Sequence, residues 1–165
     1  LTQHGIAKAP YRVFQLLHRL GDQIYTKEFN RGTLDVYAVE KGEAGALQLL
    51  LVNHNSLRHP IQEETLKVKI SGGGPCVKAE IERVDGEHAN ALAAWERMGS
   101  PGYLLEDQIL SLRAASAVAK EALGFEESGG ELRLNIVMPP MGVALATIYW
   151  GSPVPGSITM GVIKS

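Results

Sequence analysis

Apolar and polar residues alternate with a period of two along most of the chain, which predicts β-strands. Residues 46–53 are apolar at nearly every position, and this predicts a central strand that is buried on both faces. Six strands at short spacing, joined by meander-like turns, predict a mainly β fold, an antiparallel β-sandwich. The predicted strands are residues 33–39, 46–53, 64–71, 77–84, 131–137 and 143–149.

Before the first strand, residues 10–20 follow a helical pattern instead. Pro10 suits the first turn of a helix, and Gly21 is placed to cap its end. The apolar positions recur every three or four residues and together cover most of the helix circumference, so this helix is predicted to need contact on more than one side. These positions are Tyr11, Val13, Phe14, Leu16, Leu17 and Leu20.

A helical insertion over residues 85–130 is predicted between the fourth and fifth strands. A segment of this length inside a compact domain is usually functional or covers another surface. A helix is expected over 106–119, with an apolar side formed by Ile109, Leu110, Leu112, Ala115 and Val118. For the tail, residues 151–165, an extra edge strand and a loose segment are both open.

Length and composition indicate one ordinary globular domain, with a small piece of a neighbouring one. The 165 residues include 45% hydrophobic and 21% charged residues. A net charge of −2 with scattered basic residues favours neither nucleic acid nor an anionic membrane as partner. The single cysteine excludes an intrachain disulfide, and the compartment stays open between cytoplasm and periplasm. Because the chain begins at Leu1 without a signal sequence, we expect a fragment or a processed chain.

The residues that commonly carry chemistry do not form a recognisable catalytic or metal motif. The pairs Glu63-Glu64 and Glu126-Glu127 are poor catalytic candidates, because neighbours on a strand point to opposite faces. His54, His59 and Cys76 match no common zinc spacing. The sequence therefore predicts no catalytic residue, no metal and no cofactor.

The sharpest candidate site lies in the apolar, aromatic stretch 87–101 of the insertion. His88, Asn90 and Trp95 combine hydrogen-bonding groups with an aromatic plate, as sugar-contacting surfaces often do. Packing is the favoured interpretation, because a lone tryptophan on a helical stretch usually belongs to a core. The alternative is that these three residues wall an active site or an interdomain contact.

Several segments together resemble the C-terminal region of β-xylosidases of glycoside hydrolase family 39, which also holds the α-L-iduronidases. The segment Trp95 to Pro101 is the most specific, and Pro10 departs by one residue from the usual position after the lysine. The other segments are Gly5-Ile6-x-Lys8, Tyr11 with Phe14, Leu20-Gly21, Asn53, and the insertion from His88 through Arg113-Ala114-Ala115-Ser116.

The resemblance implies a retaining two-domain enzyme whose catalytic glutamates lie in a (β/α)8 barrel. Residues 1–21 would be the last strand exit and last helix of that barrel, residues 22–150 the sandwich, and residues 151–165 a tail. The acid/base Asn-Glu-Pro motif of the family does not occur in this sequence. The expected function is that of a non-catalytic accessory region, supporting the barrel of the same parent chain and shaping oligomer contacts or the active-site rim.

On this interpretation the chain meets xylo-oligosaccharide only through the barrel, and a homo-oligomer stays open. Two other classes of function are weighed: a free-standing carbohydrate-binding module and a structural interaction module. A carbohydrate-binding module needs a row of exposed aromatic rings, whereas aromatic residues make up 6% of the chain and Trp95 and Trp150 are its only tryptophans. The apolar helix also predicts self-association of the isolated chain.

Overall fold

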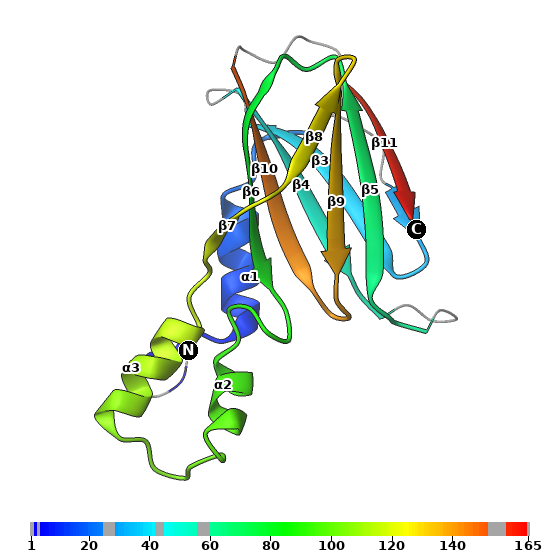
Figure 1. Cartoon of the computed structure of the whole chain (residues 1–165). Coiled ribbons are helices and arrows are strands. Elements are labelled where there is room, and N and C mark those ends of the chain that lie inside the picture. Colours follow the sequence, from blue (N-terminus) through cyan, green and yellow to red (C-terminus); the bar gives the residue numbers. More distant parts are fainter. Residues whose placement is uncertain are drawn as a thin grey trace.

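Two antiparallel sheets packed face to face form the body of the protein, with one helix beside them and a helical arm at one end (Figure 1). The computed structural model describes residues 2, 4–24, 29–41, 45–55, 60–151 and 158–164. In chain order the elements are α1 (Ala9–His18), β1 (Gln23–Ile24), β2 (Phe29–Arg31), β3 (Leu34–Lys41), β4 (Ala46–Asn53), β5 (Glu64–Ser71), β6 (Cys76–Val84), α2 (Ala91–Arg97), α3 (Glu106–Ala115), β7 (Lys120–Ala122), β8 (Phe125–Ser128), β9 (Glu131–Met138), β10 (Val143–Trp150) and β11 (Thr159–Lys164).

The larger sheet has the strand order β1-β3-β4-β10-β6-β7, with β2 also paired to β3, and the smaller sheet has the order β11-β5-β9-β8. This arrangement confirms the predicted antiparallel β-sandwich. The predicted meander is wrong, because β4 and β5 lie in different sheets, as do β5 and β6, and β9 and β10. The alternation of apolar and polar residues along a strand indicates which of its faces is buried, but not which strand lies beside it. The order of the strands could therefore not be predicted from this pattern.

β4 and β5 have the bounds that their patterns predicted, and the other four predicted strands differ from theirs by one or two residues. β4 lies between β3 and β10 and is buried on both faces, and β5 turns Lys67 and Lys69 away from the core. The main core is formed by the inner faces of both sheets. Its fully buried larger side chains include Leu34, Leu47, Leu49, Leu51, Leu66, Ile70, Ile81, Leu132, Leu134, Ile136 and Met138.

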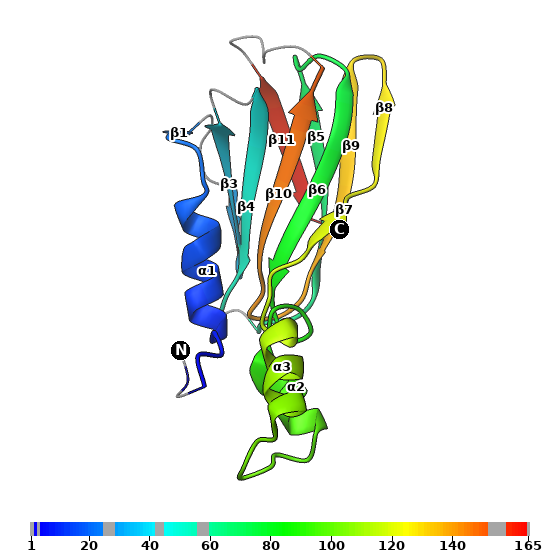
Figure 2. The ribbon, with the colours of Figure 1, turned by 90° about the vertical axis from the view of Figure 1, so that its left-hand side faces the viewer.

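Helix α1 lies along the outer face of the larger sheet (Figure 2). Its buried Leu16 packs with Val84 of β6 and Leu145 of β10. The helix ends two residues earlier than predicted, with Arg19 as its C-cap. The expected capping role of Gly21 is therefore wrong. A Cβ at Gly21 would lie 1.8 Å from the carbonyl oxygen of Glu40, so the glycine permits close contact between two backbones.

The insertion forms an arm that projects from one end of the sandwich (Figures 1 and 2). We call α2, α3 and their connection the arm. The predicted helix over 106–119 ends at Ala115, and Leu110, expected on its apolar side, is exposed. Residues 120–130 contain two strands that the sequence did not predict: β7 extends the larger sheet beside β6, and β8 extends the smaller sheet beside β9. Both strands are short and exposed, so they lack the alternation that reveals a half-buried strand.

The tail contains an edge strand, one of its two open interpretations. β11 pairs with β5 in antiparallel register from Thr159 opposite Ser71 to Lys164 opposite Leu66. Residues 152–157 and 165 of the tail lie outside the described residues, as do His59 and residues 42–44 of a predicted turn. None of the described helices has the length and apolar character needed to cross a membrane.

Candidate functional site

A buried carboxylate organises the turn that leads from β6 into the arm. Asp85 accepts hydrogen bonds from the backbone N–H groups of Glu87 and His88, both at 2.8 Å, and from Nδ1 of His88 at 2.9 Å. The backbone N–H of Asp85 donates in return to the carbonyl oxygen of His88. Burial alone would raise the pKa of Asp85, but the hydrogen bonds from Glu87 and His88 outweigh it and lower that pKa. Asp85 therefore holds the turn as a carboxylate.

His88 supports this turn rather than facing a cavity. Its Nδ1 contacts the Asp85 carboxylate, and its Nε2 lies 3.7 Å from Oε1 of Glu121 on β7. The next residue, Ala89, is buried and has a φ of 52°, so the backbone is held in a conformation that non-glycine residues rarely adopt. Both ring nitrogens of His88 are therefore directed to acidic groups that connect the turn with the sandwich.

Asn90 is the N-cap of α2. Its Oδ1 accepts the backbone N–H of Ala93 at 3.2 Å, which satisfies one of the free donors at the start of the helix. Its Nδ2 donates to the carbonyl oxygens of Asp85 and Gly86. The side chain thus joins the turn to the helix, while Asn90 also lines the cavity described below.

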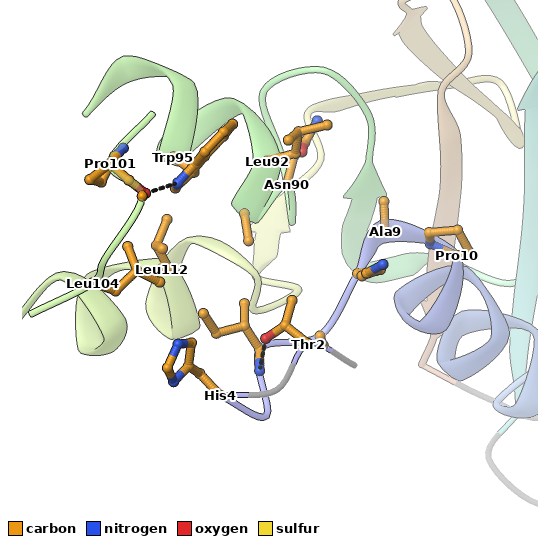
Figure 3. A pocket seen from close by; sticks show the side chains of 15 residues that line it. Thr2, His4, Ala9, Pro10, Asn90, Leu92, Trp95, Pro101, Leu104 and Leu112 are labelled. Atoms are coloured by element: carbon orange, nitrogen blue, oxygen red, sulfur yellow. Dashed lines mark hydrogen bonds between the residues drawn. The ribbon is translucent and has the colours of Figure 1, made fainter. Parts of the chain in front are cut away.

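Trp95 lies half-buried on α2, with its indole N–H donated to the carbonyl oxygen of Pro101 at 3.1 Å (Figure 3). The chain turns back at Gly99 and Ser100, both of which have positive φ. Trp95 packs beside a small core made by Ile6, Ala94 and Leu112. The segment Trp95 to Pro101 is therefore a closed turn held by its own tryptophan.

The arm and the N-terminal segment line a largely apolar cavity of about 820 Å³ that is open to solvent on one side (Figure 3). This volume falls in the range of small-molecule sites. Thr2, His4 and Ile6 form one wall, and residues of α2 and α3 form the others. Asn90 and Trp95 line the cavity and His88 does not, so the structure brings together two of the three candidate residues. The lining also includes Ala7, Lys8, Ala9, Pro10, Ala91, Leu92, Pro101, Gly102, Leu104 and Leu112.

The N-terminal segment is tied to the arm by contacts that the sequence did not reveal. Arg113 donates from NH2 to the carbonyl oxygen of His4 at 2.9 Å. Arg12 on α1 donates from Nε to the carbonyl oxygen of Ser116 at 2.6 Å and from NH2 to its hydroxyl at 3.2 Å. Ile6 and Arg113 belong to segments that carried the family resemblance, which was the available signal. The hydrogen bond from Arg113 to His4, across 109 residues, was not visible in the sequence.

The residues considered for a metal are placed elsewhere. His54 lies 2.7 Å from the Asp35 carboxylate, a hydrogen bond that raises the pKa of His54. Cys76 is half-buried, with its thiol directed to the carbonyl oxygen of Lys78. In the part of the chain that the structure describes, no three or more His, Cys, Asp or Glu side chains form a group that could hold a metal ion.

The fold and the cavity define a class of module: a two-sheet β-sandwich with a helix on its larger sheet and a helical arm. Solved β-xylosidases share this fold. A monomeric β-xylosidase from Caulobacter crescentus CB15 superposes with a TM-score of 0.59 at 15% identity, over 91% of this chain and 32% of its own. The family 39 enzyme from Xanthomonas axonopodis pv. citri gives a TM-score of 0.60 at 17% identity, over 88% of this chain and 31% of its own.

The family follows from sequence comparison. A β-xylosidase from Caldicellulosiruptor saccharolyticus is 34% identical over 154 residues, which cover 92% of this chain and 31% of that relative. The model of the family "Glycosyl hydrolases family 39" matches residues 1–132, and the chain belongs to this family. It spans about a third of the length of these relatives. The predicted resemblance to this family is confirmed.

Proposed function

We infer that the chain is the non-catalytic accessory region of a β-xylosidase-like retaining glycoside hydrolase, and that α1 packs against the catalytic barrel of the same parent chain. The observation that carries this proposal is the two-sided character of α1. One side is buried on the sandwich through Leu16, while on the other side Phe14 is 70% exposed and Tyr11 and Leu17 are also exposed. A single helix rarely leaves several large apolar side chains in water unless another surface covers them.

The relatives support the presence of that other surface. The chain covers about a third of their length, so most of each relative lies in a part that this chain does not contain. On this proposal residues 1–21 are the last part of a (β/α)8 barrel, whose outer helices pack on the barrel with one side. The other side of α1 would then join barrel and sandwich. The catalytic carboxylates would belong to the barrel.

The same proposal assigns the arm to the rim of the substrate site. It packs on Ile6 and binds the carbonyl oxygen of His4, in the segment that leads into the N-terminal end of α1. In (β/α)8 barrels the catalytic loops follow the strands and lead into the N-terminal ends of the helices. An arm beside that end of the last helix would therefore lie on the catalytic side, with Asn90 and Trp95 lining the cavity and His88 holding the turn.

The non-catalytic role is tested by hydrolysis of p-nitrophenyl β-xyloside, with the intact mass of the same sample determined by mass spectrometry. The isolated chain, of 17.8 kDa, is expected to release no nitrophenol above the rate in buffer. A sample of this mass that hydrolyses the substrate would overturn the proposal, because it would place a complete site in these residues.

Phe14→Asp tests the docking role of α1. The isolated chain is expected to self-associate through the exposed side of α1, and the variant should weaken that association about tenfold or more, because a charge replaces an exposed ring. Sedimentation velocity measures the change. In the longer enzyme, the same variant should lower the melting temperature. Lys8→Asp, at an exposed position just before the helix, is the matched control, and an equal effect of both variants would contradict a docking side.

Trp95→Ala in the longer enzyme separates a rim from simple packing. The rim proposal expects kcat/KM for xylo-oligosaccharide to fall about tenfold, while Trp95→Phe, which keeps an aromatic plate, retains most activity. Hydrogen exchange of α2 and α3 shows whether the arm stays folded in each variant. If Trp95→Ala unfolds the arm and activity is unchanged, Trp95 only packs the arm and the rim role is wrong.

Sugar binding by the isolated chain distinguishes the carbohydrate-binding alternative. Trp150 is buried in the sandwich core, and the N–H of Trp95 is used by Pro101. These placements leave the described residues without a row of exposed tryptophans. Calorimetric titration with xylohexaose should therefore give no saturable heat, whereas saturable binding would favour a carbohydrate-binding module.

A further inference from the structure

The arm is joined to the body of the protein by two connections, residues 85–90 and residues 116–119, and it projects beyond the end of the sandwich (Figures 1 and 2). The first connection is a turn held by the hydrogen bonds between His88 and Asp85, which follows β6. The second connection begins at Ser116, the C-cap of α3, which is 1% exposed. The direction in which the arm projects therefore depends on how Ser116 is held.

Arg12 of α1 holds Ser116 with two hydrogen bonds from one guanidinium group. Its Nε donates to the carbonyl oxygen of Ser116 at 2.6 Å, and its Nη2 donates to the hydroxyl oxygen at 3.2 Å. The hydroxyl donates in turn to the carbonyl oxygen of Arg113, in the last turn of α3. The carbonyl groups at the C-terminal end of a helix carry partial negative charge, which favours a cation at this place. Arg12 thus combines a contact at two points with a favourable charge.

The guanidinium group of Arg12 is itself oriented by α1. Its Nη1 donates to Oε1 of Gln15 at 2.7 Å, one turn further along the helix. The ring of Tyr11 lies 5.9 Å away, within reach of a cation–π contact. The helix is fixed on the larger sheet by its buried Leu16. The arm therefore cannot turn relative to α1 without breaking the contacts between Arg12 and Ser116.

We propose that Arg12 is a positioning residue that sets the direction of the arm relative to α1, and with it the opening of the substrate site. This inference rests on the proposed function, in which α1 packs on the catalytic barrel and the arm forms part of the rim. Arg12 then connects the rim to the barrel side of the molecule. Because a rim lies outside the innermost sugar site, a displaced arm should affect long substrates more than short ones.

The direction of the arm is measured in the isolated chain as the distance between two spin labels. Tyr103→Cys, 95% exposed in the arm, and Val137→Cys, 41% exposed on β9, carry the labels in a chain with Cys76→Ser. Dilution with unlabelled chain restricts the measured distances to those within one molecule. The distance distribution should widen about twofold or more in Arg12→Ala. Arg12→Lys should widen it less, because lysine keeps the charge but not the two-point contact.

Arg19→Ala is the matched control for the spin-label experiment. Arg19 lies on the same helix, but its Nη1 binds Oε1 of Glu82 on β6 at 2.8 Å and not the arm. Its removal should lower the melting temperature, because the buried Glu82 loses its cationic partner. The distance distribution should nevertheless stay as narrow as in the chain with Arg19. A change in direction is thereby separated from a general loss of stability.

The consequence for the substrate site is measured in the longer enzyme. Arg12→Ala should raise KM for xylohexaose about tenfold while kcat changes less than about twofold, because a displaced rim weakens binding and leaves the reacting groups in place. Hydrolysis of p-nitrophenyl β-xyloside, which carries a single sugar, should change less than about twofold. Arg12→Lys should recover part of the affinity for xylohexaose.

The two measurements keep this inference distinct from the proposed function. A distance distribution that Arg12→Ala leaves unchanged, or that Arg19→Ala widens equally, would overturn the positioning role of Arg12. If Arg12→Ala widens the distribution and leaves KM unchanged, while Trp95→Ala lowers kcat/KM, the link from Arg12 to the substrate site is wrong. If neither variant changes the kinetics, the rim role in the proposed function is wrong, and the link to the substrate site falls with it.

Discussion

Replacing Ile6 by Asp is expected to unfold the arm while the sandwich stays folded. Ile6 is 3% exposed and belongs to the small core of the arm with Ala94 and Leu112. A carboxylate at this position would be buried without a partner, which costs about 3–5 kcal/mol. Two helices of seven and ten residues are too short to be stable in water without packing. The arm should therefore lose its order when the N-terminal segment no longer completes its core.

Hydrogen exchange measured by mass spectrometry checks this expectation. Amides of α2 and α3 should exchange faster by two or more orders of magnitude, which corresponds to about 3 kcal/mol, while those of β4 and β10 keep their protection. Leu92→Asp is the matched control, because Leu92 belongs to α2 of the arm and is 61% exposed. Unchanged exchange in the arm, or equal loss of protection in β4 and β10, would contradict the idea that the N-terminal segment holds the arm.

Three of the segments that carried the family resemblance meet in this region. Gly5 and Ile6 come from the start of the chain, the turn from Trp95 to Pro101 closes α2, and Arg113 lies near the end of α3. Arg113 binds the carbonyl oxygen of His4, and a Cβ added at Gly5 would lie 3.9 Å from its guanidinium. The features of the sequence that sandwich folding alone does not explain are therefore the ones that build the arm and its cavity.

The strands of the core could be predicted because the burial of each side chain is reflected in the spacing of apolar and polar residues along the strand. In β5, Leu66, Val68 and Ile70 are buried and alternate with lysines. In β4 nearly every side chain is buried, and the sequence is continuously apolar. The two-sided pattern of α1 likewise predicted a helix with a second apolar surface. In each case a residue's burial depends on the face of its own element, which spacing along the chain records.

The order of the strands and the short edge strands could not be predicted in the same way. β7 and β8 have exposed side chains, so they leave no periodic signal and exist through backbone pairing with β6 and β9. The sequence marked Gly21 as a structurally important glycine but gave the wrong reason. The glycine is needed because it lies against the backbone of Glu40, which comes from another part of the chain. These features depend on which segments meet, and local spacing carries no information about that.

In the candidate site, too, the local contacts could be predicted from the sequence and the contacts between distant segments could not. The favoured packing interpretation agrees with the hydrogen bonds of His88 and Asn90, which are made mostly within a few residues of their own positions. The cavity beside Trp95 depends on Ile6 and Leu112, which come from two distant segments. Residue types drew attention to this segment, but only the folded chain shows that Asn90 and Trp95 line one cavity and that His88 lies outside it.

Asp85→Asn is expected to lower the free energy of unfolding by about 2–4 kcal/mol at neutral pH, because the carboxylate accepts two backbone N–H groups and Nδ1 of His88. An amide keeps the shape of the side chain but loses the charge and turns one oxygen into a donor. Urea unfolding followed by circular dichroism measures the change. Asp107→Asn, at an exposed position in the first turn of α3, is the matched control and should cost less than about 1 kcal/mol.

The direction in which the stabilisation by Asp85 changes with pH follows from the direction of its pKa shift. The pKa of Asp85 is lower in the folded chain than its ordinary value of 3.8, despite the opposing effect of burial. The folded state therefore binds the proton less readily than the unfolded state, and stability from Asp85 is fully present above the ordinary pKa and is lost as the pH falls through the lowered one. The difference between the wild-type chain and Asp85→Asn should thus be largest near neutral pH and shrink below about pH 4. If the two chains differ in unfolding free energy by the same amount at neutral pH and below about pH 4, Asp85 stabilises the turn by its shape and not by its charge.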